Sequence, residues 1–250
     1  MARMNRWIIT YRPNSSARMR LFCCPYAGGA ANVFRTWPDR LPPETEVCAV
    51  ELPGRWTRLR EPPIASMSSL VEAAVAGLAP GLDRPFALFG HSLGALIAFE
   101  IARQLRRTGG PSPTCLIVAG CHAPQVSTTH RPLYQLPTDE FLRVMNERYG
   151  GIPRAVLEDS ELLRVILPAM RADIEAFETY SYSQEPPLDL PICAFGGLAD
   201  TLAPPPSVHA WCHQTSVSFT SHMFHGGHFF FHDTEREFFE VLSSELGRIA

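Results

Sequence analysis

Residues 85–95 read Pro-Phe-Ala-Leu-Phe-Gly-His-Ser-Leu-Gly-Ala and indicate the architecture around them. An apolar run typical of a strand leads into Gly90-His91-Ser92-Leu93-Gly94, and a helix-like pattern follows over residues 95–107. A serine at the tip of such a sharp turn needs glycines two positions before and after it, because side chains there would meet neighbouring backbone. The pentapeptide alone arises by chance in about one chain in ten of this length, so the flanking strand and helix are what make it specific.

Apolar runs and helix-like segments alternate along most of the chain. This alternation predicts an α/β fold with a mostly parallel sheet and helices on both faces. A chain of 250 residues with 46% apolar content is long enough for one such core. Ser66 and Ser68 are the candidate N-caps of one helix. Strands are expected at 20–24, 46–52, 85–89, 114–119, 191–195 and 217–220, and helices at 32–41, 66–82, 95–107 and 235–249.

The segment 123–182 interrupts the alternation because it contains no predicted strand. One helix is expected from Pro137 to about Arg148, a break at Gly150-Gly151-Ile152-Pro153, and one or two further helices over 157–180, starting near Asp159 or Ser160. An insertion of this length is too long for a simple crossover, and such insertions usually carry function. We therefore expect a helical lid within a single domain of residues 1–250, with ordinary packing helices as the alternative.

Composition and charge exclude several classes of protein. The net charge is −3 without a long run of one sign, so nothing favours nucleic-acid binding. The first twenty residues contain no apolar signal region, and no stretch reaches the roughly 18 apolar residues of a membrane helix. A cytoplasmic location is therefore expected. Seven irregularly spaced cysteines agree with it, and the adjacent Cys23 and Cys24 are interpreted as core side chains on opposite faces of a strand.

Ser92 needs a base to become a nucleophile, and that base needs an orienting acid. After a turn of this kind the order along the chain is serine, acid, histidine. Asp200 is the expected acid because it follows a strand, at the sheet edge where sites of open α/β sheets lie; a turn aspartate is the alternative. His228 is the expected base, since it follows the last strand and the glycines before it allow the ring to approach Ser92.

Histidines at 222, 225 and 232 are the rivals of His228, and together the four raise the question of a metal site. Gly226-Gly227 argues against a helix that presents His225 and His228 together. No Cys or carboxylate set completes the coordination shell, so no metal is expected. His91 is interpreted as structural.

An oxyanion hole requires two N–H groups aimed at the reacting carbonyl oxygen. One is expected from the backbone of Leu93, directly after the nucleophile. The other is expected from Ala27, in the glycine-rich loop 25–30 that follows the first core strand.

Taken together, these residues resemble the type II thioesterases of nonribosomal peptide and polyketide assembly lines, over nearly the whole chain. Trp56 departs from the family pattern, in which a small or acidic residue is expected after Pro-Gly-Arg. The motifs that carry the resemblance are Phe22-x-x-Pro25-x-Ala27-Gly28-Gly29, Leu52-Pro53-Gly54-Arg55, Glu61-Pro62-Pro63, the pentapeptide with Ala95, Arg171-Ala172-Asp173, Phe195-Gly196-Gly197 and Gly227-His228-Phe229-Phe230.

The resemblance implies an α/β-hydrolase fold with a helical lid, a catalytic triad of Ser92, Asp200 and His228, and Ala27 and Leu93 as oxyanion donors. It implies a substrate acyl group on the phosphopantetheine thiol of a carrier protein, no cofactor of the enzyme itself, and an editing role in trans. A monomer is the default expectation. Arg55, Arg58 and Arg60 share one loop, and we hypothesise that they contribute to carrier docking; three solvated arginines are the alternative.

Three other functions remain open from the sequence. A fatty-acyl thioesterase or a carboxylesterase of the same fold would use the same residues. A catalytically inactive protein of this fold could serve as a binding partner, although the intact triad argues against it. Acyl transfer to an alcohol or amine would pass through the same acyl-enzyme.

Overall fold

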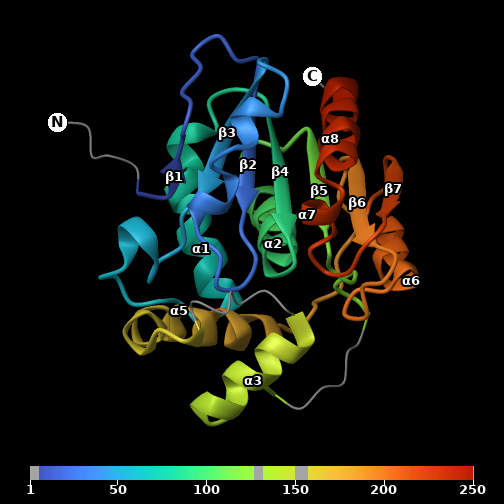
Figure 1. Cartoon of the computed structure of the whole chain (residues 1–250). Coiled ribbons are helices and arrows are strands. Elements are labelled where there is room, and N and C mark those ends of the chain that lie inside the picture. Colours follow the sequence, from blue (N-terminus) through green and yellow to red (C-terminus); the bar gives the residue numbers. More distant parts are fainter. Residues whose placement is uncertain (1–5, 127–131, 150–156, 250) are drawn as a thin grey trace, which may run out of the picture.

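The computed structural model describes residues 6–126, 132–149 and 157–249 and has a seven-stranded sheet at its centre (Figure 1). The strand order is β1-β3-β2-β4-β5-β6-β7, and every neighbouring pair is parallel except β1 with β3. The predicted α/β fold is therefore confirmed. The strands are β1 (Ile8–Ile9), β2 (Met19–Cys24), β3 (Thr45–Val50), β4 (Phe86–His91), β5 (Cys115–Ala119), β6 (Ile192–Gly197) and β7 (Phe219–Phe224).

The two faces of the sheet bury separate apolar clusters. One face packs against α1 (Met67–Leu78), α2 (Leu93–Thr108) and α6 (Pro205–His209). The other packs against α8 (Glu235–Ile249), α7 (Phe230–Asp233) and the short 3₁₀ helices η1 (Ala31–Phe34) and η2 (Trp37–Asp39). Successive strand residues alternate between the clusters, and Cys24 lies in the first and Cys23 in the second, as expected for a strand buried on both sides.

Within the described residues between β5 and β6, two helices lie across the end of the sheet where the parallel strands finish (Figure 1). The helix expected from Pro137 is α3 (Thr138–Tyr149), and the later one is α5 (Ser160–Glu178). Asp159 caps α5 by accepting hydrogen bonds from the N–H groups of Glu161 and Leu162 at 3.0 and 2.9 Å. The break predicted at 150–153 lies outside the described residues.

Some predicted elements were wrong in kind or in extent. The helix expected at 32–41 is two short 3₁₀ helices, because Pro38 lacks the N–H group that a continuous helix would donate to Phe34 and instead lies in the first turn of η2, where none is needed. The last strand begins at Phe219, since the N–H of Val217 is held in a turn by the Thr215 hydroxyl. Ser66 occupies the N-cap position of α1, but its hydroxyl contacts Ser68 instead of capping the helix.

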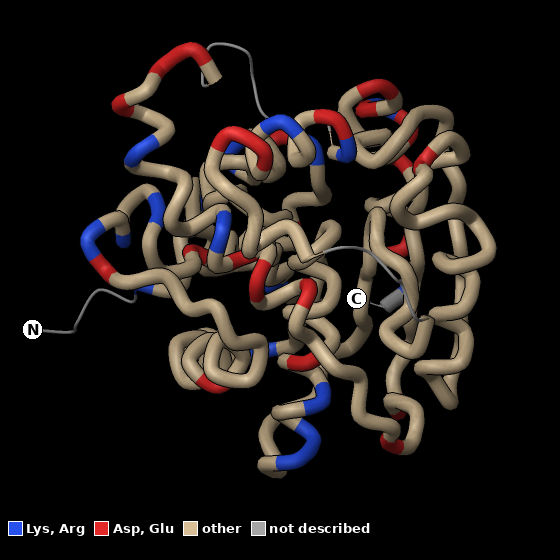
Figure 2. Tube along the Cα trace, turned by 90° about the horizontal axis from the view of Figure 1, so that it is seen from below, with Lys and Arg blue, Asp and Glu red and all other residues tan. Residues whose placement is uncertain are grey.

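No helix in the described part of the chain is long and apolar enough to cross a membrane. Seen from the end covered by α3 and α5, acidic and basic positions are mixed along the trace (Figure 2).

Candidate active site

Ser92 lies at the tip of the turn between β4 and α2 and has a strained backbone. Its φ is 56° and its ψ is −121°, and among the described residues Trp56 is the one other non-glycine with positive φ. Its N–H is held by the carbonyl of Ala119 at 2.8 Å. Such conformations persist where the surrounding structure enforces them, and they cluster at functional sites.

The glycines on either side of Ser92 are required by backbone contacts. A Cβ atom on Gly90 would lie 2.0 Å from the carbonyl oxygen of Gly94. A Cβ atom on Gly94 would lie 2.2 Å from the carbonyl oxygen of Cys24, at the end of β2. The pattern that predicted the turn from sequence thus has a steric cause.

Three residues that the sequence singled out form one hydrogen-bonded chain. His228 Nε2 lies 3.1 Å from Ser92 Oγ, and His228 Nδ1 lies 2.9 Å from Asp200 Oδ2. The side chains of His228 and Asp200 are 7% and 1% exposed. The three residues come from the ends of β4, β6 and β7, which meet at one edge because the strands are parallel.

The environment of Asp200 favours its ionised form. Burial raises the pKa of this carboxyl. The hydrogen bond and charge of His228 and the N–H groups of Leu202 and Ala203 lower it by more than burial raises it, so the pKa of Asp200 is below the usual 3.8. An ionised Asp200 accepts a hydrogen bond from Nδ1–H of His228. The lone pair of Nε2 then faces the Ser92 hydroxyl, which is the arrangement a general base requires.

His91 has a structural role, as expected, and the structure identifies its partner. Burial, followed by the charge of His228, lowers the pKa of His91 from 6.5 to about 3, so the ring is neutral. Its Nε2–H donates to the backbone oxygen of His228 at 2.8 Å. Its Nδ1 has no hydrogen-bond partner among the described residues. His91 therefore anchors the loop that carries His228.

The rival histidines lie elsewhere. His225 and His232 make no hydrogen bond to Ser92 within the described residues, and His222 pairs with Glu245 at 2.8 Å. Cys193, His222 and Glu245 also have possible metal-ligand atoms within 4.8 Å of one another, a grouping that sequence reasoning missed because it joins three elements. However, Arg248 also donates to Glu245, and burial raises the pKa of the Cys193 thiol, so neither side chain favours a cation.

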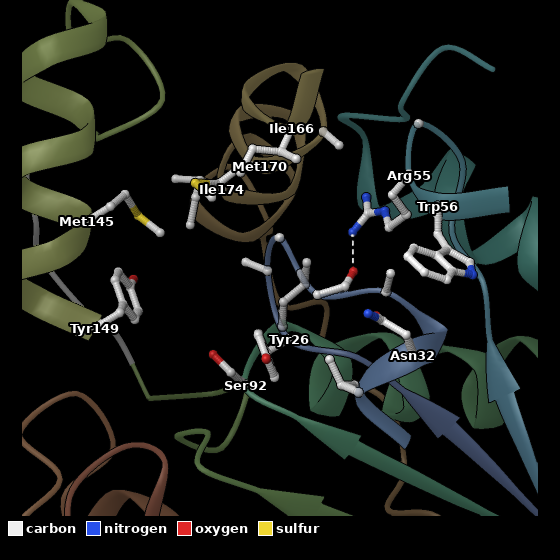
Figure 3. Close-up of a pocket in the computed structure, with 18 of the residues that line it drawn as sticks. Tyr26, Asn32, Arg55, Trp56, Ser92, Met145, Tyr149, Ile166, Met170 and Ile174 are labelled. Carbon is white, nitrogen blue, oxygen red and sulfur yellow. Dashed lines mark hydrogen bonds between the residues drawn. The ribbon is translucent and has the colours of Figure 1, made fainter. Parts of the chain in front are cut away.

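A pocket of about 520 Å³ opens from Ser92 and His228 toward α3 and α5 (Figure 3). Ala27 and Leu93, the expected oxyanion donors, both line it. Its far walls are mainly apolar, and Met145 and Tyr149 of α3 face Ile166, Met170 and Ile174 of α5 across it. The site therefore offers a serine with a base and an apolar chamber beside it.

The comparisons with known proteins agree with this geometry. Residues 19–246 match the family model of the thioesterase domain. The chain belongs to the thioesterase family. The gramicidin S biosynthesis protein GrsT of Aneurinibacillus migulanus is 38% identical over 246 residues, which cover 98% of this chain and 96% of GrsT.

Solved structures of other thioesterases have the same fold as this thioesterase. The RedJ thioesterase from the prodiginine biosynthetic pathway of Streptomyces coelicolor is 39% identical with a TM-score of 0.86, covering 92% of this chain and 91% of RedJ. YbtT, a type II thioesterase of the yersiniabactin NRPS/PKS pathway, is 31% identical with a TM-score of 0.83, covering 94% of this chain and 96% of YbtT. The resemblance to type II thioesterases is thereby confirmed, and this thioesterase is a hydrolase that acts on thioesters.

Two of the three arginines proposed for carrier docking are buried in this thioesterase. Arg55 is 7% and Arg58 is 6% exposed, and they bond to Asp173 and Glu61 respectively, while Arg60 is exposed. The alternative of three solvated side chains is therefore wrong, because Arg60 alone of the three is exposed, and a contribution of this loop to carrier docking stays a prediction. Trp56, the residue that departs from the family pattern, is 59% exposed and lines the pocket.

Proposed function

We propose that this thioesterase hydrolyses acyl groups from the phosphopantetheine thiol of carrier proteins in nonribosomal peptide and polyketide synthesis. Its role is to clear misprimed or stalled carriers. The observation that carries the proposal is the Ser92–His228–Asp200 hydrogen-bonded chain, which opens into an apolar pocket. The relatives GrsT, RedJ and YbtT, which are named for such biosynthetic pathways, support the substrate class.

The first half-reaction forms an acyl-enzyme. His228 takes the proton of the Ser92 hydroxyl while Oγ attacks the thioester carbonyl, and Asp200 stabilises the resulting imidazolium. The backbone N–H groups of Ala27 and Leu93 stabilise the tetrahedral oxyanion. The pantetheine thiolate then leaves and takes the proton from His228, which returns the ring to its neutral form. Because the conjugate acid of the thiolate has a pKa near ~8.5, its departure needs little help from an acid.

The second half-reaction releases the acid. His228 deprotonates a water molecule, which attacks the acyl carbonyl on Ser92, and the same two N–H groups stabilise the second oxyanion. Collapse of this intermediate returns the proton to Ser92. No step requires a cofactor of the enzyme, since nucleophile, base and oxyanion donors all come from the chain.

The segment 123–182 acts as the lid of a single domain spanning residues 1–250. Its helices α3 and α5 supply Met145, Ile166, Met170 and Ile174 to the pocket, so the lid forms the acyl chamber. A pocket of about 520 Å³ lies within the range of roughly 300–1,000 Å³ that small-molecule sites occupy. The chamber therefore accepts acyl groups longer than acetyl, and the enzyme acts as a monomer on carriers of a separate synthase.

A panel of carriers loaded with acetyl, butyryl, hexanoyl and decanoyl groups tests the proposal. Intact-protein mass spectrometry of each carrier follows loss of the acyl group, with Ser92→Ala as the control. We expect release of acetyl and short acyl groups by the wild type and none by the variant. Release of decanoyl alone would indicate a chain-terminating fatty-acyl thioesterase. Hydrolysis of simple oxyesters with every carrier left intact would indicate a carboxylesterase. Either result would refute the editing role.

A further inference from the structure

A buried ion pair joins the helix α5 to the loop after β3. Arg55 donates to both carboxylate oxygens of Asp173, at 2.6 Å from Nη1 to Oδ2 and 2.7 Å from Nη2 to Oδ1. The two side chains are 8% and 1% exposed. This bidentate geometry is the strong form of an Arg–carboxylate ion pair, and it fixes the orientation of both side chains.

The same pair holds the glycine-rich loop 25–30 at two successive residues. The N–H of Gly28 donates to Asp173 Oδ2 at 2.7 Å. Arg55 Nη1 donates to the carbonyl of Gly29 at 3.0 Å, and Figure 3 marks a hydrogen bond from Arg55 to this loop. In addition, a Cβ atom on Gly28 would lie 3.3 Å from the Met170 side chain of α5, so the loop also packs directly on that helix.

These contacts lie one peptide away from Ala27. The N–H of Gly28 belongs to the peptide unit whose carbonyl is that of Ala27, so its bond to Asp173 restrains the backbone torsions of Ala27. Gly28 itself has a φ of 78°, a conformation that needs glycine and that a fixed partner helps to hold. The direction of the Ala27 N–H therefore depends on where α5 places Asp173.

We propose that Arg55 and Asp173 are a positioning pair that sets the oxyanion hole through Gly28 and Gly29, and so links the position of the lid helix to the rate of the chemical step. The inference rests on the proposed function, because it assigns Ala27 as an oxyanion donor. Such donors act only when they lie within about 2.7–3.1 Å of the developing oxyanion, so small displacements reduce transition-state binding more than substrate binding. Acyl groups that displace α5 would be processed slowly even when bound.

The test compares Asp173→Asn and Arg55→Lys with a matched control. Asp173→Asn keeps the shape of the side chain but loses the charge, and Arg55→Lys keeps the charge but loses the planar fork. Glu100→Gln is the control, because Glu100 pairs with the buried Arg103 at 2.5 Å between α2 residues. In the described residues neither partner bonds to loop 25–30.

Two readouts separate positioning from general structural damage. The first is kcat and KM on an acetyl carrier. The second compares two affinities. One is for an alkyl trifluoromethyl ketone, which forms a tetrahedral adduct with a serine, and the other is for a carrier that bears an uncleavable, amide-linked acyl group. For Asp173→Asn we expect kcat and the affinity for the trifluoromethyl ketone to fall together, by about 10- to 100-fold. This loss is smaller than the roughly 10²–10³-fold loss of kcat that follows complete removal of an oxyanion-hole donor. In Asp173→Asn, KM and the affinity for the amide analogue should stay within about twofold of the wild-type values. Arg55→Lys should lose less kcat and less ketone affinity than Asp173→Asn. Glu100→Gln should keep the wild-type kcat.

A folded Asp173→Asn variant with the wild-type kcat would overturn the proposal. So would equal losses of affinity for the ketone and the amide analogue, because a role in the oxyanion hole alone leaves the amide analogue unaffected. If Asp173→Asn does not fold, as judged by thermal unfolding, Arg55→Lys decides by the same comparison. The ketone needs no carrier, so a wild type that binds it but leaves carriers intact would refute the proposed function without affecting the test of the pair.

Discussion

Gly94→Ala perturbs the turn around Ser92 with a single methyl group. The added Cβ atom would lie 2.2 Å from the carbonyl oxygen of Cys24 and 2.6 Å from that of Pro25, whereas ordinary van der Waals contacts begin at 3.4 Å. Both oxygens are backbone atoms, so no side-chain rotation relieves the contact. The end of β2 and the start of α2 must separate by about 1 Å, a displacement that moves loop 25–30 relative to Ser92.

The expected magnitude follows from this displacement. A misplacement of about 1 Å at reacting groups costs roughly 10²-fold in rate, so kcat/KM on an acyl carrier should fall at least that far. Overpacking a core costs typically ~1–3 kcal/mol. For a chain of this size that loss corresponds to a Tm lower by about 2–12 °C.

Gly247→Ala is the matched control for Gly94→Ala. Gly247 lies exposed in α8, and a Cβ atom there meets nothing within 4 Å. Removing glycine from a helix should stabilise the protein by about 0.5–1 kcal/mol and leave the rate unchanged. Thermal unfolding and carrier hydrolysis of both variants give the comparison. A Gly94→Ala variant with the Tm and kcat/KM of the wild type would refute the steric account of the turn.

Three further predictions concern the site. Asp200→Asn should lower kcat by about 10³–10⁴-fold with the fold intact, because asparagine favours the wrong tautomer of His228; a loss below tenfold in steady-state assays would contradict this. The depressed pKa of His91, about 3 against 6.5 unfolded, means that the unfolded chain binds more protons below pH 6.5, so stability is lost as the pH falls. Urea unfolding at pH 7 and at pH 5 measures this loss. Between the two pH values the free energy of unfolding of the wild type should fall by about 2 kcal/mol more than that of His91→Gln, and equal losses would count against a neutral, buried ring. Ile166→Trp should fill the chamber and reduce kcat/KM for decanoyl carriers at least tenfold more than for acetyl carriers; equal effects would show that the acyl chain lies elsewhere.

Much of the site could be predicted from the sequence because local patterns and parallel topology determine it. The glycines around Ser92 reflect contacts within one turn, and Asp200 and His228 follow strands whose ends meet at the same edge of the sheet. The apolar spacing at 32–41 predicts one helix and not the two 3₁₀ helices at 31–39, because that spacing carries no information on the N–H group that Pro38 lacks.

Contacts between distant segments could not be predicted in this way. Arg55 and Asp173 both lie in motifs that carried the family resemblance, yet nothing in either motif says that they pair, since 118 positions separate them. The bond from His91 to the backbone of His228 spans 137 positions and depends on the fold of the final loop. Arg55 and Arg58 were assigned to the surface because charged residues usually lie there, and their burial depends on partners that only the tertiary structure brings close.

The most direct test of the account is to look for the acyl group on Ser92 itself. Wild-type enzyme mixed with an acetyl-loaded carrier and acid-quenched within milliseconds would be digested and mapped by mass spectrometry. The account predicts an acetyl group on the Ser92 hydroxyl that accumulates and then disappears as acetate is released. Acetate release with Ser92 unmodified at every time point, or with the acetyl group on another residue, would contradict it.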